Sequence, residues 1–225
     1  MAKDLLVSAW DKYPEVITNI EQWRPNKEKV EFYLKKVKDL LNCTTEIDMV
    51  VIYFVGAFDN NPFVAPYSEG RIAFCLPIEG DREDIDLVHE LTHIVHSKTA
   101  ELSVSWQRSV GAIIIQEGLA MQVSKYLIPG RLDEVYTEYT KGWLKDCEKN
   151  AESITKGILP FLEESSYEKV YQFTMGQGST GIEREAYFVG WKLVQQLLID
   201  GMFFEAIAKI KEPEMPETVR RLVQY

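Results

Sequence analysis

Hydrophobic residues recur first at helical spacing and then in short continuous runs along the first third of the chain. Residues 25–41 begin with Pro25 and carry apolar side chains every three or four positions, which predicts an amphipathic helix. Residues 49–56 and 71–77 are apolar, rich in β-branched and aromatic side chains, and predict two buried strands. The segment between these strands contains many Asn, Pro and Gly residues, and we interpret it as a loop.

The rest of the chain follows a helical pattern. An acidic turn precedes a predicted helix over residues 84–97 and supplies carboxylates where the helix dipole favours them. Residues 174–181 form the clearest Gly-rich linker. Further helices are expected over residues 110–128, 131–150 and 183–200.

These patterns predict one α+β domain that spans residues 1–225. A chain of this length suits one well-buried domain with two lobes rather than an array of domains. The N-terminal lobe, over approximately residues 1–100, contains both strands and the 84–97 helix. The C-terminal lobe, over residues 101–225, is expected to be helical.

The charge of the chain restricts its partners. A net charge of −10 repels phosphate backbones and anionic lipids, so we expect no nucleic-acid partner. No apolar window of about 18 residues is present, and the first residues lack the features of a secretory signal, so we expect a cytoplasmic protein without a membrane partner.

The three cysteines are widely spaced and odd in number, which favours reduced thiols over disulfides or a cysteine zinc cluster: Cys43, Cys75 and Cys147.

All three histidines of the chain lie in the segment DLVHELTHIVH, residues 86–96. His89, Glu90 and His93 match the spacing H-E-x-x-H, and in a helix the two imidazoles share one face, one turn apart. Such a pair binds one metal ion, and zinc accepts neutral imidazole nitrogen. A catalytic zinc site has a third protein ligand and a water molecule, from which Glu90 can accept a proton. The competing interpretation, a chance match between structural histidines, is disfavoured because apolar neighbours bury the other faces of this helix.

Glu117 is the best candidate for the third ligand. No histidine follows His96, and Thr99 stands where the extended metzincin motif requires histidine, so that class is excluded. Glu117 lies in the otherwise apolar segment 110–128, where an ionised carboxylate is costly unless it is paired or binds a metal. Glu101 is the second choice.

Other sites fit the sequence less well. A di-iron centre requires a second E-x-x-H element, for which no histidine is left. A mononuclear iron site stays open, although Glu90 has no role in it. Residues 176–181 match G-x-G-x-x-G, but they lack a βαβ context, and we interpret them as a hinge or flap beside the cleft. A cysteine nucleophile would have to share the histidines that are needed as ligands.

Three further side chains are candidates to assist catalysis. A helix over residues 183–200 places Arg184 and Tyr187 on one side, and Gly190 allows this helix to approach another closely. A phenol or guanidinium beside the metal stabilises an oxyanion, although an aromatic core position is the competing interpretation for Tyr187. His96 lies on the same side of its helix as His89 and is a candidate to line the cleft or to donate a proton to the intermediate.

The sequence HELTH, followed by EGLA at residues 117–120, resembles the gluzincin branch of zincin metallopeptidases. Within that branch it resembles a bacterial family of predicted zinc-dependent proteases. The resemblance implies a zincin-like fold and one Zn²⁺ ion, with Glu90 as general base and three metal ligands: His89, His93 and Glu117. It also implies an edge strand above the zinc, for which residues 71–77 are the candidate. Met121 stands where many gluzincins have an aspartate that orients a ligand histidine, so this orienting group has to come from elsewhere.

The implied activity is hydrolysis of peptide bonds, with a peptide or protein substrate paired to the edge strand. The alternative from another class is a non-catalytic zinc-binding module that serves as an interaction scaffold. The presence of Glu90 favours the enzyme, because a purely structural zinc site has a fourth protein ligand in place of water.

Overall fold

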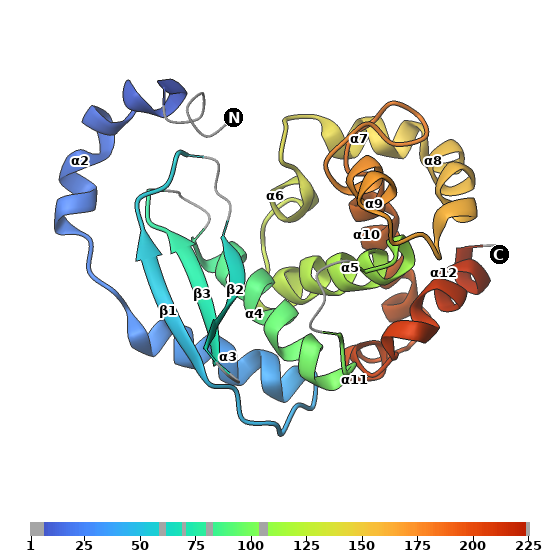
Figure 1. Cartoon of the computed structure of the whole chain (residues 1–225), viewed down its shortest axis with the longest axis horizontal. Helices are drawn as coiled ribbons and strands as arrows, with labels where there is room; N and C mark the ends of the chain where they lie inside the picture. Colours follow the sequence, from blue (N-terminus) through green and yellow to red (C-terminus); the bar gives the residue numbers. More distant parts are fainter. Residues whose placement is uncertain (1–6, 59–61, 69–70, 80–82, 104–107, 224–225) are drawn as a thin grey trace.

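A small mixed sheet lies in the N-terminal lobe (Figure 1). The computed structural model describes residues 7–58, 62–68, 71–79, 83–103 and 108–223. Within these residues the strands are β1 (Met49–Phe54), β2 (Phe63–Ser68) and β3 (Arg71–Pro77), in the order β1-β3-β2. β3 runs parallel to β1 and antiparallel to β2, so β3 is the central strand.

The edge strand next to the helical lobe is β2, and this corrects two sequence predictions (Figure 1). Residues 71–77, expected at the edge, form the central β3, whose positions 73–76 are buried. The segment interpreted wholly as a loop contains β2. Most β2 residues are exposed and the strand contains Pro66, so it lacks the apolar signal of a buried strand. Proline is tolerated at a sheet edge because no ladder hydrogen bond is required from it there.

The helices α2 (Tyr13–Gln22) and α3 (Lys27–Leu40) precede the sheet. α2 contributes no buried residue, and α3 packs against the helix that carries the histidines. The side chain of Asn26 caps α3 by accepting a hydrogen bond from the Lys29 backbone at 2.9 Å. Val30 and Val37 form its buried face. The helix expected over residues 25–41 is therefore confirmed, with its start after Pro25.

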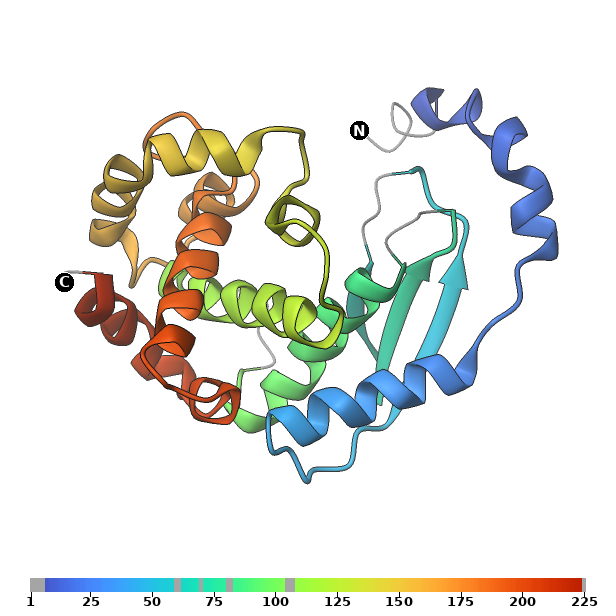
Figure 2. The ribbon, with the colours of Figure 1, turned by 180° about the vertical axis from the view of Figure 1, so that it is seen from behind.

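The histidine helix α4 (Glu83–Thr99) lies between the sheet and the helical lobe (Figure 2). It was predicted over residues 84–97 and is confirmed. Its apolar side chains are buried on the remaining faces, namely Leu87, Val88, Leu91, Ile94 and Val95. Burial of these faces fixes the rotation of α4, which leaves the side of His89 and His93 partly exposed.

The C-terminal lobe is built around α5 (Val110–Leu127), which is almost wholly buried. The Ser109 side chain caps α5 by accepting a hydrogen bond from the Ala112 backbone at 3.2 Å. α10 (Glu185–Ile199) packs closely along α5, as Gly190 predicts. The surrounding helices are α8 (Ala151–Ile158), α9 (Tyr167–Thr174), α11 (Phe204–Ala208) and α12 (Met215–Val223), with 3₁₀ turns η1 (Leu159–Phe161) and η2 (Glu212–Glu214).

The helix expected over residues 131–150 is wrong as a single element. The structure has α6 (Asp133–Thr137) and α7 (Trp143–Lys149), separated by an irregular segment. Gly142 adopts φ +89°, a left-handed conformation that interrupts a helix. The Glu138 carboxylate accepts hydrogen bonds from the backbone of Gly142 and Leu144, both at 3.0 Å, and so stabilises the start of α7.

The described residues thus form a mixed α+β structure that is mostly helical. None of its helices, over the ranges given above, combines the length and apolar character needed to cross a bilayer. The three cysteines are free and buried, which agrees with the expected reduced thiols.

Candidate metal centre

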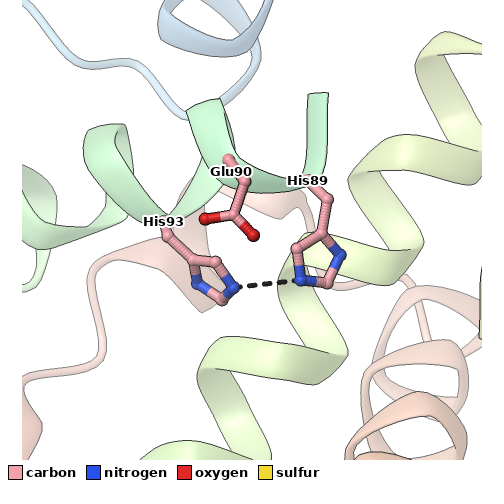
Figure 3. Close-up of side chains that lie close together, drawn as sticks. All are labelled: His89, Glu90 and His93. Atoms are coloured by element: carbon pink, nitrogen blue, oxygen red, sulfur yellow. Dashed lines mark hydrogen bonds between the residues drawn. The ribbon is translucent and has the colours of Figure 1, made fainter. Parts of the chain in front are cut away.

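α4 brings two imidazoles together on one face. His89 and His93 lie one turn apart, and their Nε2 atoms are separated by 3.1 Å. Figure 3 shows both rings on the same side of the helix, with the Glu90 carboxylate directed toward them. Possible ligand atoms of the three side chains lie within 4.8 Å of one another, so this cluster can hold a metal ion.

The Glu117 side chain, which belongs to α5, lies next to the two imidazoles of α4. Its Oε2 lies 3.2 Å from His89 Nε2 and 3.5 Å from His93 Nε2. In a tetrahedral zinc site the donor atoms lie about 2.0–2.1 Å from the ion, and therefore about 3.3–3.4 Å from one another. The three separations here, including 3.1 Å between the imidazoles, are close to that spacing. The donor set therefore fits one zinc-sized cation.

Two carboxylates thus border the histidine pair, and their electrostatic environments differ. Burial raises the pKa of Glu90 above its ordinary value, an effect opposed by the nearby imidazoles. Burial would also raise the pKa of Glu117, but positive charge on His93 and hydrogen bonds from His89 and His93 outweigh it and lower that pKa. Glu117 is therefore held as an anion, which suits a ligand. Glu90 has an increased proton affinity, which suits a general base.

The charges of Glu90 and Glu117 also change the pKa of His93. Burial alone would lower it, but the charge and hydrogen bond of Glu117, together with the charge of Glu90, raise it to about 8. The pair of carboxylates therefore favours a cation at this position. A divalent ion satisfies the same preference when it replaces the imidazole proton.

The cluster lies in a cavity of about 680 Å³ between the two lobes. Phe63 and Val64 of the edge strand form one wall, and side chains from α6 and the segment after it form another. The side chains of His89, His93 and Glu117 are 16–21% exposed, so an ion and a small part of a substrate can reach them from the cavity. The cavity therefore connects the β2 edge with the candidate metal centre.

Tyr187 and Arg184 both line this cavity, as their position on one side of the predicted helix suggests. Burial and the negative charge of Glu117 raise the pKa of Tyr187, which stays protonated and can donate a hydrogen bond. The Arg184 guanidinium lies over the Tyr187 ring, 4.3 Å from its centroid. Sequence and structure therefore place a phenol and a guanidinium in the same cavity as the candidate metal centre.

His96 and Glu101 lie elsewhere. His96 is fully buried and does not line the cavity, contrary to the expectation that it borders the cleft. Burial lowers its pKa to about 3, so it is neutral near neutral pH. Glu101, the second choice for a ligand, is 76% exposed and pairs with Lys211 at 2.7 Å.

The linker at residues 176–181 is anchored by Glu185. Both carboxylate oxygens of this buried side chain accept hydrogen bonds from the backbone and hydroxyl groups of Ser179 and Thr180, at 2.6–2.8 Å. None of the six linker residues, all of them described, lines the cavity. The structure therefore gives this segment a fixed position away from the cleft rather than the expected place of a flap beside it.

Sequence reasoning missed Arg108 and Gln116 in the cavity wall. Arg108 donates a hydrogen bond to Gln116 Oε1 at 2.9 Å and another to the Ser103 carbonyl at 3.2 Å. Gln116 directly precedes Glu117 in the apolar helix, and a second buried polar side chain there is a signal that could have revealed it. Arg108 gives no comparable signal, because it stands outside every predicted helix and strand.

Comparison with known proteins returned no match among protein-family models, curated proteins or solved structures. The case for a metal site therefore rests on the geometry of the cluster itself.

Proposed function

We propose that this chain is a zinc-dependent peptidase with a zincin-like arrangement of its two lobes. His89, His93 and Glu117 are the zinc ligands. The observation that carries the proposal is the convergence of Glu117 Oε2 on both imidazoles, at 3.2 and 3.5 Å, from a different helix. Zinc is favoured over iron because two imidazoles and a carboxylate stand beside Glu90, a carboxylate positioned to act as a base.

A zinc ion in this site would supply a Lewis acid that polarises a carbonyl group and increases the acidity of a bound water. Glu90, with its raised pKa, accepts the proton of the attacking water and passes it to the leaving amine. Tyr187 donates a hydrogen bond to the oxyanion that develops on the substrate. An extended peptide pairs with the β2 edge, where Phe63 and Val64 border the cavity.

Replacement of Glu90 by Gln tests this proposal. The variant keeps size, helix propensity and all three ligands, but it has no carboxylate to accept a proton. We expect zinc content and thermal stability close to wild type, with cleavage of a broad peptide library reduced to background. Glu101→Gln is the matched control, because it makes the same change on an exposed side chain outside the cavity.

Undiminished cleavage by Glu90→Gln would refute this mechanism. Absence of cleavage by fully zinc-loaded wild-type protein, tested on the same library, would favour the non-catalytic zinc-binding module.

A further inference from the structure

Arg184 carries an unusual uncompensated charge in the cavity wall. Its guanidinium lies over two tyrosine rings, 4.3 Å from the centroid of Tyr187 and 4.9 Å from that of Tyr139. Aromatic faces attract a cation but do not neutralise it. Nε of Arg184 is buried and has no hydrogen-bond partner among the described residues. The side chain is thus held over the two rings, and its Nε is left without a hydrogen-bond partner.

The two carboxylates next to Arg184 in sequence are directed to other partners. Glu183 accepts a hydrogen bond from the Tyr139 hydroxyl. Glu185 is fully buried and uses both oxygens to bind residues 179–180. Over the described part of the chain, no carboxylate forms an ion pair with Arg184. The local sequence Glu-Arg-Glu therefore presents an arginine without its expected counter-ion.

The backbone at Arg184 supports a functional interpretation. It adopts φ +59° and ψ +35°, a left-handed conformation that is unfavourable for a residue with a Cβ atom. Such strain, like the partial burial of an unpaired charge, reduces stability unless something else offsets it. A ligand that supplies a carboxylate would offset the charge, because the guanidinium edge matches a carboxylate with two parallel hydrogen bonds.

Arg108, the second arginine of the cavity, also has a buried Nε without a hydrogen-bond partner among the described residues, but its two terminal nitrogens are in use. Arg108 already donates to Gln116 Oε1 and to the Ser103 carbonyl. Glu138, a cavity carboxylate close in sequence to Tyr139, accepts from two backbone N–H groups at the start of α7. Arg184 is therefore the cavity cation with the most hydrogen-bonding capacity left for a substrate.

We infer that Arg184 binds a carboxylate of the peptide substrate and so makes acidic peptides the preferred substrate class. This inference rests on the proposed peptidase function, because it assumes that a peptide occupies the cavity. The carboxylate comes either from an Asp or Glu side chain near the cleaved bond or from the C-terminus of a short peptide. Both sources present the same group to the guanidinium.

Binding of labelled peptides to the full-length, zinc-loaded Glu90→Gln protein tests the inference while the peptides stay intact. One arm compares peptides that differ only by Glu or Gln at single positions. A second arm compares a free C-terminal carboxylate with its amide. We expect one of these pairs to differ at least about tenfold in affinity, as for a charge-assisted hydrogen bond, and the arm that responds identifies the source.

Arg184→Gln in the same protein should abolish that preference while leaving the affinity for the neutral peptides unchanged. Arg184→Lys keeps the charge but not the paired donors, and should retain part of the preference. Arg131→Gln is the matched control: it removes the same charge from an exposed position outside the cavity and should leave the preference intact. Circular dichroism verifies that each variant is folded.

The inference fails if neither pair of peptides differs, if no peptide binds, or if the preference survives in folded Arg184→Gln. It also fails if Arg184→Gln weakens all peptides equally. A charge preference without cleavage by the wild-type protein would refute only the peptidase proposal. Cleavage without a charge preference would refute only the role of Arg184.

Discussion

Gly118 of α5 and Gly190 of α10 meet backbone to backbone where the two helices pack together. A Cβ atom on Gly118 would overlap the carbonyl group of Gly190, and one on Gly190 would overlap the carbonyl oxygen of Ile114. Glu117 directly precedes one glycine, and Tyr187 lies three residues before the other. The close approach of the helices therefore also fixes the position of a proposed ligand relative to a proposed oxyanion donor.

Gly190→Ala should lower the free energy of unfolding by about 1–3 kcal/mol, because the added methyl group meets backbone atoms that cannot rotate away. Displacement of α10 should also reduce turnover by moving Tyr187. Urea denaturation of the zinc-loaded protein measures the first effect. Stability equal to wild type would show that the helices separate without cost and would contradict the tight packing described here.

Glu117→Gln should abolish stoichiometric zinc binding. The amide cannot supply the anionic oxygen that faces both imidazoles, and two histidines alone hold the ion weakly. Elemental analysis of the purified variant measures the zinc content. Glu101→Gln, which alters an exposed carboxylate paired with Lys211, should retain one zinc per chain. Full zinc content in Glu117→Gln would move the third ligand to another side chain, with Glu90 the nearest carboxylate.

The candidate metal centre could be predicted from sequence because its residues obey helical geometry. The spacing of His89 and His93 places both on one face of any helix, and the apolar residues around them determine which face stays open. Glu117 was found for a related reason, since a carboxylate in an apolar helix requires a partner. These predictions use only local periodicity and the energetic cost of burying charge.

The sheet order could not be predicted in the same way. β3 is more apolar than β2, yet burial of a strand depends on its neighbours, which lie far along the chain or in another layer. The break between α6 and α7 depends on Glu138, whose carboxylate accepts hydrogen bonds at the start of α7. A capping contact between residues several positions apart leaves no periodic signal in the sequence. His96 was misplaced because a helical angle gives the direction of a side chain but not what covers it.

Tyr187→Phe should reduce turnover and leave substrate affinity nearly unchanged. Loss of a hydrogen-bond donor used mainly in the transition state costs about 2.7–4 kcal/mol, which corresponds to a rate reduction of roughly 10²–10³-fold. Steady-state kinetics on one cleaved peptide separates kcat from KM. Tyr126→Phe removes a hydroxyl from an exposed tyrosine outside the cavity and should change neither constant. Unchanged turnover in Tyr187→Phe would assign Tyr187 to packing alone.

His96 offers a test that depends on pH. The side chain is fully buried, and neither ring nitrogen has a hydrogen-bond partner among the described residues. Burial lowers its pKa from 6.5 to about 3. The folded protein therefore keeps His96 neutral over a range in which the unfolded chain protonates it.

Because the unfolded state binds this proton first, the wild-type protein should lose free energy of unfolding as the pH falls below 6.5 toward 3. The loss from this one group is at most about 1.4 kcal/mol per pH unit. His96→Leu has no proton to bind and fills a similar volume, so its stability relative to wild type should increase as the pH falls from 7 to 5.

Urea denaturation of chelator-treated proteins at several pH values measures the difference, and zinc release then makes no contribution. The other ionisable groups are common to both proteins, so their effects largely cancel in the comparison. A difference in stability that stays constant from pH 7 to pH 5 would show that His96 is accessible to protons in the folded state, contrary to its position in the core.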